Sequence, residues 1–229
     1  MGMEYSINVY KSKEKRKEIS INKIRSLGID YLESLPLTFS ADEVKIKSIE
    51  EIASRYVANI LSIQFAFDTL DNASVDDSCL FFTDLLCKYG VYNKLNEREE
   101  KAFKRELDEK ELVNLTWEYE ALNVLSWVLG FKADLEFPSD LCEVEPLIKN
   151  IIECASFEEF ISKCKLRDIE EILDELDLEY RYHWAIVNKT IDETTNIGQL
   201  DGEVVYERRK ALEWLFSEEN DWNKISLDT

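Results

Sequence analysis

Seven ionisable side chains interrupt helical stretches that are otherwise apolar, and they are the residues most able to do chemistry in this sequence. They comprise carboxylates, arginines and the single histidine: Glu118, Glu120, Asp174, Asp177, Arg181, His183 and Arg208. Carboxylates and imidazole can act as general acids or bases, and guanidinium holds carboxylate or phosphate oxygens with a planar fork. An unpaired buried charge is costly, so each should meet a partner or lie at an opening.

The spacing of the first pair places it on apolar helix faces. An ideal helix turns about 100° per residue. In a continuous helix from about Glu109 to Leu129, Glu118 falls on a leucine face and Glu120 on the opposite, tryptophan- and valine-bearing face. A helix that is apolar all round is buried. We therefore expect both carboxylates to lie inside the protein.

The remaining five residues belong to two later helices. In the helix predicted from Asp168 to Ile191, Asp177 and Arg181 are one turn apart beside the apolar stripe. Asp174 flanks the same edge, and His183 sits on the other. Arg208 lies at the centre of the apolar face of a helix from about Glu203 to Phe216. We expect a carboxylate to hold its guanidinium, with Glu120 and Asp177 as the candidates.

Two interpretations of this polar set remain open. The residues could form interhelical ion pairs that fix helix register, or they could line a pocket for a ligand. Asp174 and Asp177 have the oxygen ligands that Mg²⁺ prefers, although such pairs are common on solvated helix faces. The single histidine excludes multi-histidine zinc sites. We expect neither a metal nor a cofactor.

The elements that must position these residues are helices. Glycine (6) and proline (3) are scarce, which leaves few residues to interrupt a helix. Ser48 with Glu51, and Ser156 with Glu159, have the capping-box spacing that opens a helix. The helices are predicted at about residues 12–27, 48–67, 75–89, 96–106, 109–129, 146–154, 168–191 and 203–216, with a further one opening at Ser156.

These patterns predict a mostly α-helical fold, an irregular helical bundle formed by one domain over residues 1–229. Tyr5, Ile7 and Val9 alternate with polar residues, which favours a short extended element within residues 1–11.

Charge and cysteine content restrict the partners. Lys and Arg number 28 against 48 Asp and Glu, a net charge of −20. Such an acidic chain repels phosphate backbones and anionic membranes, so we expect neither nucleic acid nor membrane binding, whereas a basic protein partner fits. Five cysteines with no CxxC spacing indicate reduced thiols and a cytoplasmic location. No apolar run reaches the ~20 residues of a membrane span.

Three blocks of the sequence resemble one family. They are Trp117–Gly130, Ile172–Ala185, and Val204–Leu215 together with Trp222 and the terminal Asp228–Thr229. In order and spacing they resemble the bacterial family catalogued as domain of unknown function 4272. The pair Asn223–Lys224 departs from the acidic residues expected there. The resemblance implies a bacterial, intracellular, predominantly helical protein, and it transfers no catalytic residues.

Two classes of function remain. No Gly-rich phosphate loop, GxSxG or HExxH motif is present, which favours a non-enzymatic binding or regulatory protein. The alternative is an enzyme or small-ligand binder that uses the Glu/Asp/Arg/His cluster between helices. The two classes differ in whether the seven residues converge on an open pocket or are paired in a closed core.

Overall fold

Helices account for all the regular structure in the part of the chain that the computed structural model describes, residues 10–228. The predicted mostly α-helical fold is confirmed. The extended element expected within residues 1–11 falls, except for Tyr10 and Lys11, outside the described residues. Two compact units are distinguished: residues 10–45 with Asp168–Gly198, and Ile46–Arg167 with Gln199–Asp228. The single domain over 1–229 stays a prediction.

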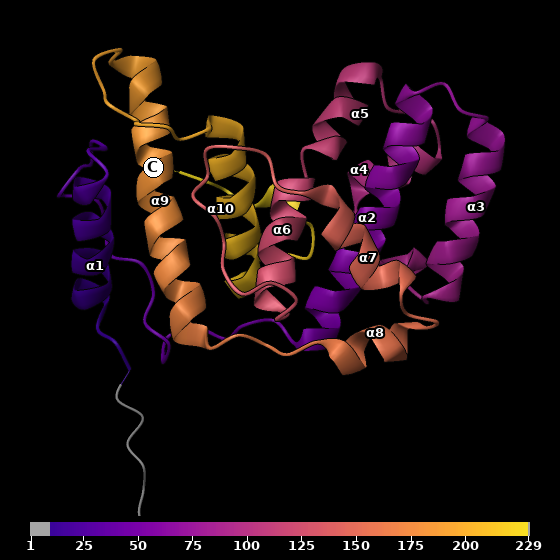
Figure 1. Cartoon of the computed structure of the whole chain (residues 1–229), viewed down its shortest axis with the longest axis horizontal. Coiled ribbons are helices and arrows are strands. Elements are labelled where there is room, and N and C mark those ends of the chain that lie inside the picture. The colour runs from indigo at the N-terminus through magenta and orange to yellow at the C-terminus, as the bar shows by residue number, and fades with distance from the viewer. Residues whose placement is uncertain (1–9, 229) are drawn as a thin grey trace, which may run out of the picture. The chain divides into compact units, whose positions relative to one another are not determined.

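The first unit is a pair of helices, α1 (Lys13–Ser26) and α9 (Ile169–Ile191), that lie side by side (Figure 1). Side-chain caps open both helices, because Ser12 accepts a hydrogen bond from the Lys15 amide and Asp168 from the Glu170 amide. Both starts and both ends agree with the sequence prediction within one residue.

The second unit is built around α2 (Ile49–Leu70), whose residues 52–63 are all buried. The predicted capping box of Ser48 and Glu51 opens this helix. Several elements pack against α2 (Figure 1). They are α3 (Val75–Lys88), the 3₁₀ turn η1 (Tyr92–Lys94), α4 (Glu97–Phe103), α5 (Glu109–Thr116), α6 (Tyr119–Val128), α7 (Val144–Ile152) and α8 (Phe157–Lys163). A last helix, α10 (Gly202–Phe216), packs on α6 and is followed by the 3₁₀ turn η2 (Trp222–Lys224).

The continuous helix predicted from Glu109 to Leu129 is wrong. The chain forms α5 and α6 with a break at Trp117 and Glu118, where the amides of Glu118 and Glu120 bond three residues back, to Leu115 and Trp117. No glycine or proline marks the break. Contacts that Glu118 makes with distant residues stabilise it, and a local sequence pattern does not contain them. The opposite faces assigned to Glu118 and Glu120 therefore do not apply.

Smaller corrections concern helix ends. Pro146 lies in the first turn of α7, as expected, but the helix begins two residues before it, at Val144. The Glu159 carboxylate accepts a hydrogen bond from the Ala155 amide, so the second capping box is incomplete. Gly130, which ends α6, has a φ of +81°, and a Cβ there would lie 2.7 Å from the Lys165 carbonyl oxygen. Glycine is required at this close approach. Within residues 10–228, no helix is both long enough and apolar enough to cross a bilayer.

Candidate functional site

The seven predicted residues divide between the two compact units. Asp174, Asp177, Arg181 and His183 belong to the first compact unit, and Glu118, Glu120 and Arg208 belong to the second. Six of the seven are buried, as predicted, and Asp174 is partly exposed.

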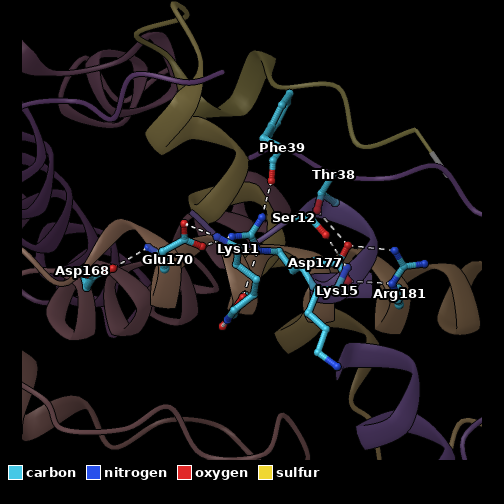
Figure 2. Close-up of polar contacts among 11 residues, drawn as sticks. Lys11, Ser12, Lys15, Thr38, Phe39, Asp168, Glu170, Asp177 and Arg181 are labelled. Carbon is cyan, nitrogen blue, oxygen red and sulfur yellow. Dashed lines mark hydrogen bonds and ion pairs between the residues drawn. The ribbon is translucent and has the colours of Figure 1, made fainter. Parts of the chain in front are cut away.

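Asp177 and Arg181 form a closed pair on α9, here called the Arg181 cluster together with Thr38. The Arg181 Nε donates to Asp177 Oδ2 at 2.8 Å and its Nη2 to Oδ1 at 2.9 Å, and both side chains are fully buried. The Thr38 hydroxyl donates to Asp177 Oδ1 at 2.9 Å (Figure 2). Paired charges and added hydrogen bonds offset the desolvation of the two ions, while Arg181 Nη1 is buried without a hydrogen-bond partner among the described residues.

A neighbouring group on α1 and α9, the Arg16 cluster, contains a buried arginine that sequence reasoning missed. Arg16 is fully buried and donates from Nε to Asp174 at 3.0 Å, from Nη1 to the Phe39 carbonyl at 2.5 Å, and from Nη2 to Glu170. Lys11 also binds Asp174, and Figure 2 shows the Lys11, Glu170 and Phe39 contacts. The spacing of Arg16 could have predicted this burial, because Arg16 is four residues before Ser20 and eight before Ile24, and all three are buried on one face of α1.

Asp174 and Asp177 therefore have cationic partners, which supports the ion-pair interpretation for this part of the set. Throughout the described range, no group of three or more His, Cys, Asp or Glu residues could hold a metal ion. His183 is buried on α9.

Glu118 enters a second network, the Lys210 cluster, in the second unit. Its carboxylate accepts from Arg98 Nη1 at 2.9 Å and from Asn59 Nδ2 at 2.5 Å, and Lys210 Nζ lies 3.8 Å away. Lys210 lies 2.6 Å from Glu207 Oε2. Burial raises the pKa of Glu207 to about 7, because desolvation outweighs the attraction of Lys210.

Glu120 holds Arg208, which confirms one of the two partners expected for that arginine. Arg208 Nε lies 3.4 Å from Glu120 Oε2, and Nη1 donates to the Glu136 carbonyl at 2.6 Å. The other Glu120 oxygen accepts from the Cys142 amide at 2.5 Å. Burial and the adjacent Glu120 raise the pKa of the Cys142 thiol, so it stays protonated at neutral pH.

Small-molecule sites are clefts of about 300–1,000 Å³. A cavity of ≈ 560 Å³ is lined in part by Arg208. We call it the Arg208 cavity. Its lining combines amides, hydroxyls, a thiol, apolar side chains and charges from the α6–α7 segment and α10. It consists of Asn123, Ser126, Phe131, Lys132, Glu136, Phe137, Ser139, Asp140, Leu141, Cys142, Glu143, Pro146, Leu147, Asn150 and Arg208.

Asn123 in this lining has a donor without a partner. Lys132 Nζ donates to Asn123 Oδ1 at 3.0 Å, and because an ammonium cannot accept, this bond fixes which end of the amide is oxygen. The Nδ2 group is buried and has no hydrogen-bond partner among residues 10–228. Asn123 is 1% exposed. Buried donors are nearly always satisfied, so this amide marks a place for an acceptor.

Two other polar side chains of the lining, Asn150 and Ser126, are joined by a hydrogen bond. Asn150 Nδ2 donates to the Ser126 hydroxyl and to the Tyr56 hydroxyl, each at 3.2 Å, and Tyr56 donates to the Leu147 carbonyl at 2.9 Å. Sequence reasoning missed Asn123, although an amide within the apolar run Ala121–Leu125 is the same kind of anomaly as Glu120.

Comparisons with known proteins leave this geometry as the main source of functional information. No curated protein and no solved structure matches the chain. A family model described as domain of unknown function (DUF4272) matches residues 16–225. The match includes the blocks that carried the resemblance, except the terminal Asp228–Thr229, and every residue of the Arg181, Lys210 and Arg208 sites. The chain therefore belongs to the DUF4272 family.

Proposed function

We propose that this protein is a non-enzymatic binding protein that takes a small ligand into the Arg208 cavity, with the Asn123 amide as the donor that recognises it. The unpartnered Nδ2 group of Asn123 carries the proposal. A buried amide that lacks an acceptor costs ~1–3 kcal/mol, and a bound oxygen atom would recover that cost. A ligand that supplies this oxygen is therefore bound selectively.

The charges of the lining support a ligand with two different ends. Arg208 and Asn123 are buried, so the inner wall is rich in donors and favours a carbonyl or carboxylate oxygen. Three exposed carboxylates line the same cavity: Glu136, which is paired with Lys132, and Asp140 and Glu143. Those exposed carboxylates favour an ammonium group at the outer end. We infer a small amino-carbonyl compound with an apolar body that fits Phe131, Phe137, Leu141 and Leu147.

The chemistry of the lining supports binding in preference to catalysis. The Cys142 thiol is protonated at neutral pH, and a thiol in that state is a poor nucleophile. Glu120, which is next to the lining but not part of it, is already engaged by an ion pair with Arg208 and a hydrogen bond from the Cys142 amide. The basic protein partner expected from the net charge stays a prediction.

The test uses three probes that differ by one group. Leucinamide has an amine and an amide carbonyl, isoamylamine lacks the carbonyl, and 4-methylpentanamide lacks the amine. Calorimetric titration of the whole protein should show leucinamide binding roughly fivefold or more tightly than either analogue, the factor that one hydrogen bond supplies. In Asn123→Leu, leucinamide and isoamylamine should bind equally.

The control is Asn22→Leu, an exposed asparagine on α1, which should leave all three affinities unchanged. The proposal is wrong if no probe binds with a Kd below about 10 mM, or if Asn123→Leu keeps the preference for leucinamide.

We also propose a bacterial cytoplasmic location. The cysteines in the described range are free thiols, as expected in a reducing compartment, and the family resemblance implies a bacterial protein. Fractionation of cells that express a tagged chain should recover it with cytoplasmic markers. Recovery with periplasmic or membrane markers would exclude this location.

A further inference from the structure

A second cavity, in the same compact unit, has two unpartnered donors in its wall. Its volume is ≈ 460 Å³, and its lining comes from the start of α2, the η1–α4 segment and the chain after α10. We call it the Arg55 cavity. Its lining includes Lys47, Arg55, Lys94, Asn96, Trp214 and Lys224, together with the acidic residues Glu51, Glu97, Glu219 and Asp221.

Asn96 provides the first donor. It is the N-cap of α4, where its Oδ1 accepts from the Glu99 amide at 2.9 Å. That bond orients the amide, so Nδ2 is the end that remains. Nδ2 is buried and has no hydrogen-bond partner within the part of the chain that the structure describes, and Asn96 is 6% exposed.

Arg55 provides the second donor. Its Nη1 donates to the Lys94 carbonyl at 3.1 Å and its Nη2 to the Glu99 carboxylate, while the face of the guanidinium lies 5.2 Å from the Trp222 ring centre. The Nε group is buried and, across residues 10–228, makes no hydrogen bond. Arg55 is 4% exposed, and Nε–H is always a donor.

Cations accompany these donors, and the acidic residues of the lining are engaged elsewhere. Lys47 donates to the Ser217 carbonyl and lies over the Trp214 ring, and Lys94 and Lys224 are exposed. Glu51 caps α2, and Glu219 accepts from the backbone amides of Asn220 and Asp221. Glu97 and Asp221 lie 3.7 and 3.8 Å from Lys224 Nζ. The groups left to meet a ligand are therefore the guanidinium Nε–H of Arg55 and the amide of Asn96, with the Lys94 ammonium exposed nearby.

We propose that the Arg55 cavity is a second binding site, which takes a small oxyanion through Arg55 Nε and Asn96 Nδ2. A guanidinium N–H bonds most strongly to an anionic oxygen, and a carboxylate or phosphate group offers two oxygens to two donors. This site differs in character from the Arg208 cavity, where one neutral amide donor awaits an acceptor. Neither site depends on the other.

The test follows the two donors directly by NMR of the full chain labelled with ¹⁵N. The Arg55 Nε–Hε and Asn96 Nδ2 signals, assigned with Arg55→Lys and Asn96→Asp, are titrated with inorganic phosphate, acetate and chloride at matched ionic strength. We expect saturable shifts of both signals with phosphate or acetate and none with chloride. The tighter of the two anions identifies whether the site prefers a phosphate or a carboxylate group.

Asn96→Ser tests the role of the amide without loss of the helix cap, because serine is also a favoured N-cap. It should weaken oxyanion binding roughly tenfold or more, since a hydrogen bond to a charged group supplies at least that factor. Asp108→Asn, an N-cap substitution on α5 outside the cavity lining, should leave binding unchanged. Shifts that chloride reproduces, an absence of saturation, or full binding by Asn96→Ser would each overturn the proposal.

Discussion

The Arg181 cluster and the wall of the Arg208 cavity look alike in the sequence and differ in the structure. Each places polar side chains on an apolar helix face, and Asp177 and Arg181 in the first, like Asn123 and Arg208 in the second, are each about 99% buried or more. In the Arg181 cluster, both Asp177 oxygens accept from Arg181 and one also accepts from Thr38. In the cavity wall, Asn123 has one satisfied end and one donor that no described residue satisfies.

This difference separates two reasons for burying a polar group. A group whose partners come from the chain itself contributes to stability and specificity, and its loss is felt by the fold. A group left with an unsatisfied atom beside a cavity costs stability, and its loss is felt by a ligand. Burial alone does not distinguish these cases, and neither does an unsatisfied atom alone, because Arg181 Nη1 also has no hydrogen-bond partner among the described residues. Asn123 differs in that its unsatisfied donor belongs to a residue that lines a cavity.

The largest effect should come from Asp177→Ala. This substitution leaves the buried Arg181 charge without its carboxylate, and breaking such a pair costs ~3–5 kcal/mol. Urea denaturation followed by circular dichroism should show the loss. Glu97→Ala, which removes an exposed carboxylate paired with Lys101, should leave the midpoint within experimental error. Equal urea midpoints for Asp177→Ala and Glu97→Ala would show that the buried Asp177–Arg181 pair contributes no more to stability than an exposed ion pair.

Arg208→Ala should have the next largest effect, about 3 kcal/mol, at the lower end for a buried pair. The Arg208 Nε lies 3.4 Å from Glu120 Oε2, and water in the adjacent cavity can solvate the carboxylate that remains. Arg208→Lys should recover little, because an ammonium cannot bond both Glu120 and the Glu136 carbonyl through a planar fork. Wild-type stability in Arg208→Ala would assign this arginine to the ligand and not to the fold.

The Lys210 cluster should give an intermediate effect that depends on pH. Because the folded pKa of Glu207, about 7, exceeds its ordinary value of 4.5, the folded state binds more protons than the unfolded state between these values. The contribution of Glu207 to the stability of the folded state is therefore complete below pH 4.5 and is lost as the pH rises through 7. The shift corresponds to an upper limit of about 3 kcal/mol, which coupling to Lys210 reduces.

Glu207→Gln measures this contribution. From pH 5 to pH 8, its free energy of unfolding should rise relative to that of the wild type by an amount on the order of 1 kcal/mol. Parallel profiles of the two proteins would show that Glu207 is ionised throughout, with the attraction of Lys210 stronger than the cost of desolvation.

The smallest effect should come from Asn123→Leu. The substitution loses the contact with Lys132, which keeps its ion pair with Glu136, and it removes a buried donor that no described residue satisfies. We expect a change within about 1 kcal/mol in either direction. Asn59→Leu is the matched comparison, since Asn59 Nδ2 donates to both Glu99 and Glu118. Asn59→Leu should lower the free energy of unfolding by at least about 2 kcal/mol. If it lowers stability less than Asn123→Leu does, the distinction between a satisfied and an unsatisfied buried amide is wrong.

Much of the fold was predictable because helix ends depend on local chemistry. Ser12, Ser48 and Asp168 accept hydrogen bonds from amides two or three residues on, and Gly28 supplies the positive φ after α1. The break at Glu118 was not predictable in this way. It depends on Asn59 and Arg98, which lie 59 and 20 residues away.

The candidate site shows the same division between local and distant information. Apolar periodicity was enough to predict that Glu118, Glu120, Asp177 and Arg208 are buried, and the pairing of Asp177 with Arg181 follows from a spacing of one turn. Periodicity limited the expected partners of Arg208 to Glu120 and Asp177 but could not choose between them, because Glu120 is 88 residues away. It also could not show that Asp174, in one compact unit, and Glu118, in the other, belong to different networks.

The sequence by itself determined most of the helices and caps, the acidic charge, the family, and that Glu118, Glu120, Asp177 and Arg208 are buried. These follow from interactions within a few residues or from composition, both of which can be read along the chain. Only the tertiary structure decided which buried polar groups are satisfied. Asn59 and Asn123 are both asparagines in apolar helix stretches, yet one amide nitrogen meets two carboxylates and the other meets none. Partners are set by the packing of distant segments, and an unpartnered donor beside a cavity exists only once that packing has formed.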